Sequence, residues 1–105
     1  MFLGELVFTS SDAVYTPPVD RQSNTAAFAV EVSQISGTSP SLAIDIEHKN
    51  LVDSSWSTAA SFTALTAAGA GAKVATGLKE QVRLKLTMSG TNGWARAFVY
   101  PPQWQ

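Results

Sequence analysis

Two runs of alternating apolar and polar residues within residues 26–50 constrain the fold of this chain more than any other feature. One side of each run is apolar: Phe28, Val30 and Val32 in the first, and Leu42, Ile44 and Ile46 in the second. Alternation with a period of two, carried by β-branched residues, is typical of half-buried β-strands. Gly37 and Pro40 lie between the runs, where they favour a turn. The pattern predicts a β-hairpin with one buried face.

The rest of the chain predicts further short strands. Residues 82–100 alternate in the same way around an Asn92-Gly93 pair, which predicts a second hairpin. We expect a strand near the N-terminus and an edge strand over residues 13–16, which Pro17 and Pro18 would end. Residues 60–66 and 73–76 are predicted strands around an AAGAGA turn, with a helix over residues 57–68 as the alternative. Seven or eight short strands predict an all-β, antiparallel β-sandwich or jelly-roll-like fold.

Length and composition narrow the classes of protein. The 105 residues predict a single domain, residues 1–105, with an N-terminal strand or arm over 1–10 and an extended tail over 101–105. There is no cysteine, which suits assembly in a reducing cytoplasm. The net charge is −1 and 14% of the residues are charged, so we expect neither nucleic acid nor a membrane as partner. Gly4 and Glu5 interrupt the apolar N-terminal run, so we expect no signal peptide.

No motif in the sequence predicts catalysis. His48, the only histidine, is in phase with the apolar side of its run and is expected at the rim of the core. The glycines before Lys73 lack the spacing of a phosphate-binding loop, and no nucleophile elbow is present. We therefore predict no catalytic residue, no metal site and no cofactor. Glu31, Asp45 and Glu47 share the polar face of the first hairpin, and pairing with Arg83 and Lys85 would set the strand register.

The aromatic residues and the two ends of the chain are the candidates for binding. Trp56 and Trp94 are expected in the core or at its rim. Trp104 follows two prolines in a terminal tail, where it could equally pack on its own domain or insert into a partner. The residues predicted to bind a partner are Phe2, Leu3, Leu6, Phe8, Trp94, Tyr100, Pro101, Pro102 and Trp104.

Several segments resemble the small β-sandwich structural proteins of tailed bacteriophages. The similar features are the alternating strand that ends in Ile-Ser-Gly-Thr, the run Leu-Ala-Ile-Asp-Ile-Glu-His, a short loop to Trp-Ser, and Arg-Leu-Lys-Leu leading into Gly-Thr. These features span residues 25–99, while the loop over residues 53–56 departs from the more glycine-rich loops of that group. The resemblance implies a virion component, and most of all a capsid decoration (cement) protein on the outer surface of a phage head.

The resemblance also implies partners and a location. They are the major capsid protein, further copies of the same chain in a homo-oligomer (a trimer is one arrangement), and the capsid surface of a virion assembled in the host cytoplasm. Two alternatives stay open. One is a carbohydrate-binding or receptor-binding module with Trp94, Tyr100 and Trp104 as a stacking platform, and the other is a phage tail or baseplate accessory protein.

Overall fold

The computed structural model describes residues 4–9 and 13–105, and for residues 4–9 it describes the backbone only. This part of the chain contains strands and no helix, which confirms the predicted all-β, antiparallel class. The strands are β1 (Gly4–Thr9), β2 (Ala13–Tyr15), β3 (Val19–Asp20), β4 (Ala26–Lys49), β5 (Ser57–Ser61), β6 (Gly69–Ala75), β7 (Gln81–Val99) and β8 (Gln103–Trp104). Within the same residues, no helix could cross a membrane.

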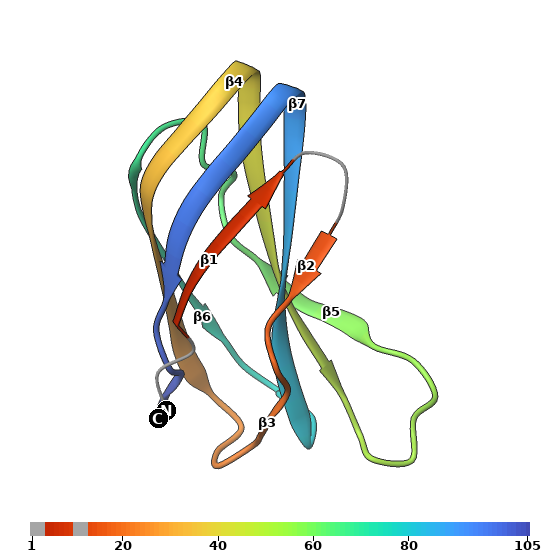
Figure 1. Ribbon diagram of the computed structural model, residues 1–105. Helices are drawn as coiled ribbons and strands as arrows, with labels where there is room; N and C mark the ends of the chain where they lie inside the picture. Colours follow the sequence, from red (N-terminus) through yellow and green to blue (C-terminus); the bar gives the residue numbers. More distant parts are fainter. Residues whose placement is uncertain (1–3, 10–12) are drawn as a thin grey trace.

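Two long strands, β4 and β7, organise the whole fold. They pair with each other from Val30↔Val99 to Lys49↔Gln81, and every other strand pairs with one of them. In Figure 1 both strands rise side by side, fold over at the top and descend again. The predicted hairpins over residues 26–50 and 82–100 are therefore wrong, because the two halves of each segment do not pair with each other. Each half pairs instead with a half of the other long strand.

Glycines make the fold-over of β4 and β7 possible. Gly37 has φ +127° and Gly90 has φ +109°, values that residues with a side chain rarely adopt. The two strands also approach closely at this bend, since a Cβ atom on Gly37 would lie 2.7 Å from the Cα of Gly93. The positions predicted to be turns thus coincide with the bend. Instead of closing two hairpins, they bend a two-stranded ribbon out of its plane.

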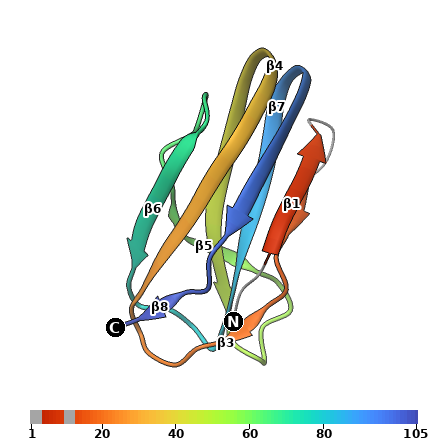
Figure 2. The same ribbon diagram turned by 60° about the vertical axis from the view of Figure 1, so that its left-hand side comes forward.

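The bend divides the sheet into two halves that face each other, as Figure 2 shows from the side. We call them the front layer (β1, β6, the first half of β4 and the second half of β7) and the back layer (β2, β3, β5 and the remaining halves). The arrangement is compatible with the predicted β-sandwich. The alternating residues that point between the layers form one buried core, which includes Phe28, Val30, Leu42, Ile44, Ile46, Val82, Leu84, Leu86, Met88 and Val99.

The middle of the chain differs from its predicted structure. Residues 57–68 contain β5 and no helix, and the predicted turn over residues 67–72 overlaps β6. Within β6 a small inner residue is required at Gly71, because the ring of Phe62 packs 3.1 Å from the position that a Cβ on Gly71 would occupy. Gly71, predicted to lie in a turn, therefore serves close packing within a strand. Pro17 and Pro18 follow β2 as predicted.

Candidate functional site

The C-terminal tail lies along the domain instead of extending from it. Beyond the end of β7, the N–H of Tyr100 donates to the carbonyl of Ala29 at 3.2 Å, and β8 then pairs with the first residues of β4. The N–H of Gln105 donates to the carbonyl of Thr25 at 2.9 Å. The tail thus continues the pairing of β7 beside β4, interrupted where two prolines lack the N–H groups that the ladder needs. The tail predicted over residues 101–105 therefore lies against the start of β4.

Trp104 belongs to this bound tail. It lies opposite Ala26 in the β4–β8 pairing, and its partly buried side chain packs against the core. Of the two alternatives left open by the sequence, packing onto its own domain is therefore the observed one. Trp104 also lines a surface groove, where part of its side chain could contact a partner.

The groove is the largest of the hollows that we describe. It has a volume of about 770 Å³ including the part open to solvent. Three of its lining residues come from the tail and three from β3 and the loop after it: Pro101, Pro102 and Trp104, and Val19, Asp20 and Gln22. Proline rings and an indole give the floor an apolar character, and Asp20 is the one charged residue in the lining.

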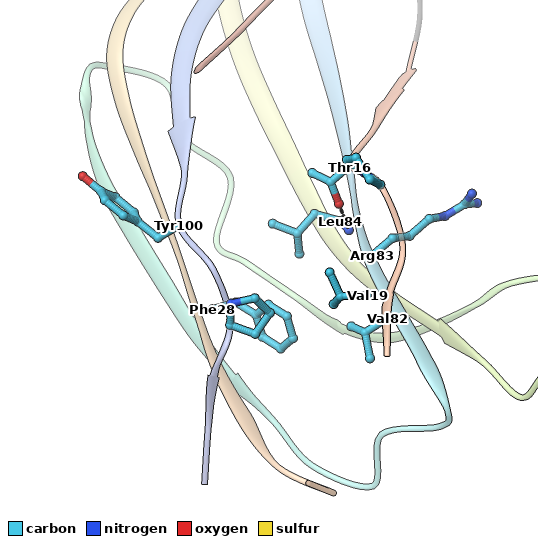
Figure 3. A pocket seen from close by; sticks show the side chains of 9 residues that line it. Thr16, Val19, Phe28, Val82, Arg83, Leu84 and Tyr100 are labelled. Atoms are coloured by element: carbon cyan, nitrogen blue, oxygen red, sulfur yellow. Dashed lines mark hydrogen bonds between the residues drawn. The ribbon is translucent and has the colours of Figure 1, made fainter. Parts of the chain in front are cut away.

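A smaller cavity adjoins the groove, because Val19 and Pro102 line both, and its volume is about 220 Å³ including the part open to solvent. Figure 3 shows Phe28, Val19, Val82 and Leu84 pointing toward one another between the layers. The Tyr100 ring and the Arg83 guanidinium point away on opposite sides. Thr16 closes one wall, where its hydroxyl accepts a 2.9 Å hydrogen bond from the Leu84 N–H. This cavity is an apolar opening into the core at the edge of the groove.

The structure brings together four of the predicted partner-binding residues: Tyr100, Pro101, Pro102 and Trp104 all line the groove or the adjoining cavity. Trp94 does not join them, because it lies opposite Ser36 close to the bend. Phe2 and Leu3 lie outside the described residues. Leu6 and Phe8 lie on β1, where they occupy the register positions opposite Ala97 and Ala95 of β7.

The three aromatic residues considered as a stacking platform for a carbohydrate ligand lie at different places on the domain. Trp94 and Phe98 lie on the outer side of β7, since the alternating Ala95, Ala97 and Val99 are buried, and Tyr100 follows the end of the strand. Trp94 and Tyr100 are about 20 Å apart along the extended chain, at about 3.3 Å per residue. Trp104 packs against the core. Trp56 and Trp94, expected in the core or at its rim, are both half-buried and lie outside the buried core cluster.

A cluster on the outer side of the back layer was only partly anticipated. The Arg83 Nε lies 2.8 Å from the Glu47 Oε1, and this ion pair confirms the predicted cross-strand pairing. Two aromatic rings lie against the guanidinium, with centroids 4.1 Å (Tyr15) and 4.3 Å (Trp56) from its central carbon. The Lys49 ammonium lies 5.4 Å from the Trp56 ring. No sequence pattern signals the aromatic contacts, which join residues from separate segments.

His48 has a structural environment, as expected for the rim of the core. Its Nδ1 accepts a 3.2 Å hydrogen bond from the N–H of Lys79, so it is half-buried and engaged as a neutral acceptor. Burial, followed by the nearby Lys79 charge, lowers the pKa of His48 below 6.5, while Asp53 opposes the shift. Among the described residues, no three histidine or carboxylate side chains gather as a metal site would require.

Comparisons with models of known protein families and with curated proteins find no match to this chain.

Proposed function

We propose that the chain is a virion structural protein that binds the outer surface of a phage head as a decoration protein. Its contact site would be the groove between its own C-terminal tail and β3. The observation that supports this proposal most directly is the gathering of Pro101, Pro102 and Trp104 around one groove. The resemblance of residues 25–99 to small phage β-sandwich proteins supplies the class of partner, namely the major capsid protein.

The chemistry of the groove suits a protein partner. Indole and proline rings offer a large apolar surface that is already held in place by the β4–β8 pairing. Binding therefore orders little of the chain, and less conformational entropy opposes it. Many copies on one shell would also bind together more firmly than a single copy binds alone.

Co-sedimentation with phage heads assembled without this protein tests the proposal. We expect the purified chain to sediment with the heads. Gln22→Lys places a cation at the exposed groove rim and should reduce the affinity for the heads at least about tenfold, the effect of about 1.4 kcal/mol. Ala43→Lys makes the same change of charge at an exposed position of the back layer and should bind like the original chain.

Three outcomes would contradict part or all of this proposal. If the chain stays in the supernatant, it does not bind heads and the proposed decoration role is wrong. Equal binding by both lysine variants would move the contact away from the groove. Binding to isolated tails in place of heads would assign the chain to the tail accessory class.

A further inference from the structure

One edge of the front layer carries a regular strand without a neighbour. β6 pairs with β4 in unbroken register from Ala26↔Ala75 to Val32↔Gly69. Among the described residues, no strand pairs with the other side of β6. The edge of the back layer differs, because β5 has a register shift between Ile46 and Glu47 of β4. Irregular edges resist the addition of another strand, and regular ones permit it.

The hydrogen bond of the tail identifies which backbone groups of β6 are unpaired. The carbonyl of Ala29 points toward Tyr100, on the side of β4 that faces away from β6. Ala29 is opposite Ala72, so this pair exchanges no hydrogen bonds across the β4–β6 ladder. The N–H and C=O groups of Ala72 therefore point outward. By the alternation of a strand, those of Ala70 and Val74 do so as well.

The side chains of β6 leave this edge accessible. Ala70 and Ala72 are exposed, and Val74 is 51% exposed. Lys73 is the only charged residue of the strand, and it lies opposite Phe28, on the other side of the sheet from these three residues. A strand that approaches β6 from the open side thus meets small apolar side chains and unpaired backbone groups.

We propose that β6 pairs with β6 of a second copy of this chain, antiparallel and centred on Ala72. In this register Ala72 faces Ala72, and Ala70 faces Val74 of the second copy. Each of these opposed pairs exchanges both N–H···O bonds, because all of their backbone groups point outward. Lys73 faces Gly71 of the second copy. A register centred on Lys73 would oppose two ammonium groups, and one centred on Gly71 would pair Val74 with Ala68, beyond the end of β6.

The resulting dimer has closed two-fold symmetry. It joins the two front layers into one continuous sheet, and Val74 packs against Ala70 of the other copy. The contact goes beyond the proposed function and does not depend on it, since a module with any binding role could dimerise in this way. It also specifies a dimer, whereas the resemblance leaves a trimer open.

Sedimentation equilibrium of the full chain over a range of concentrations tests the dimer. We expect a concentration-dependent mass that approaches twice the chain mass of 11.1 kDa. Ala72→Pro removes an outward N–H and leaves the bonds between β6 and β4, which its neighbours make, so dimerisation should weaken at least about tenfold. Ala72→Val keeps the N–H and should dimerise like the original chain. Ala72→Lys opposes two charges and should be monomeric.

Amide hydrogen exchange gives a readout that needs no substitution. The amides of Ala70, Ala72 and Val74 should gain protection as the protein concentration rises, because they become bonded only in the dimer. A chain that is monomeric at every concentration, a trimer, or an Ala72→Pro variant that dimerises unchanged would overturn the proposal. Protection of these three amides that is independent of concentration would overturn it too, since a partner within the chain would then satisfy them.

Discussion

The outer surfaces of the two layers are built from the same two strands and differ sharply in chemistry. On β4 and β7, the back surface carries Asp45, Glu47, Lys49, Arg83 and Lys85. On β4, β6 and β7, the front surface carries Glu31 and Arg96 as its charged residues, among alanines, Val74 and two aromatic side chains, Trp94 and Phe98. On these described strands, the back surface carries five charged residues and the front surface carries two.

The two surfaces also differ in how far their side chains interact within the chain. Both carboxylates of the back surface have partners within the chain, because Glu47 pairs with Arg83 and Asp45 accepts a hydrogen bond from the Ser61 hydroxyl. The front surface has apolar groups that remain exposed, such as Val74 and Tyr100. Removing charged groups from water is costly, whereas burying exposed apolar surface is favourable. We therefore expect the back surface to stabilise the fold and the front layer to supply the contacts with other molecules.

Removal of Arg83 should have the largest effect on stability. Its side chain is 20% exposed and that of Glu47 is 12% exposed, so Arg83→Ala leaves a largely buried carboxylate unpaired and removes contacts with two aromatic rings. We expect a loss of about 2–3 kcal/mol, somewhat below the cost of breaking a fully buried pair. Urea denaturation measures it.

Two companion variants make the Arg83 experiment specific. Arg83→Lys keeps the charge but loses the planar stacking, so it should cost roughly half as much as Arg83→Ala. Lys85→Ala removes the cation opposite Asp45, two residues along the same strand, and should cost less than about 0.5 kcal/mol. If Lys85→Ala destabilised the chain as much as Arg83→Ala, net charge and not the cluster would explain the back surface.

The same two strands show how far the sequence predicts this structure. Alternation places Phe28, Val30, Ile44 and Ile46 correctly in the core, because side-chain direction in a strand is a local property. It cannot distinguish a hairpin from a folded ribbon, since both need alternating halves around a turn at Gly37. The choice is made by long-range hydrogen bonding between β4 and β7. For the same reason Glu31 and Glu47, predicted on one face, lie on opposite surfaces of the molecule.

The tryptophans were the least predictable part of the candidate site. Trp104 was the one with no evident need to pack, yet it contacts the core, while Trp56 and Trp94 lie half-exposed. Strand phase explains Trp94, because Ala95 and Ala97 take the inward positions of β7. The position of Trp104 depends on the tail returning to β4, and the groove depends on Val19 and Gln22 meeting that tail. No local pattern signals either event.

A smaller, pH-dependent effect is expected at the end of the back layer, where His48 accepts its bond from Lys79. Because the pKa of His48 is lowered in the folded chain, the unfolded chain takes up the proton first as the pH falls. Stability should therefore be complete above about pH 6.5, the unfolded pKa, and should decline as the pH falls through the lower folded pKa. His48→Asn, whose side-chain oxygen can replace Nδ1 as acceptor, should flatten this decline. Thermal melting between pH 7.5 and 5 measures both, and identical slopes would exclude His48 as the cause.

The smallest effect on stability is expected on the front layer, at Val74. Val74→Thr keeps the branched shape of an exposed strand residue and replaces one methyl group with a hydroxyl, so urea denaturation of the monomer should change by less than about 0.5 kcal/mol. The same substitution should weaken dimerisation, because each copy would place its hydroxyl against Ala70 of the other. Val74→Thr would then weaken association and leave stability nearly unchanged. Arg83→Ala, which acts on the far surface, should lower stability and leave the association of folded chains unchanged. A Val74→Thr loss as large as that of Arg83→Ala would show that the front surface also holds the fold together, and the contrast between the two layers would fail.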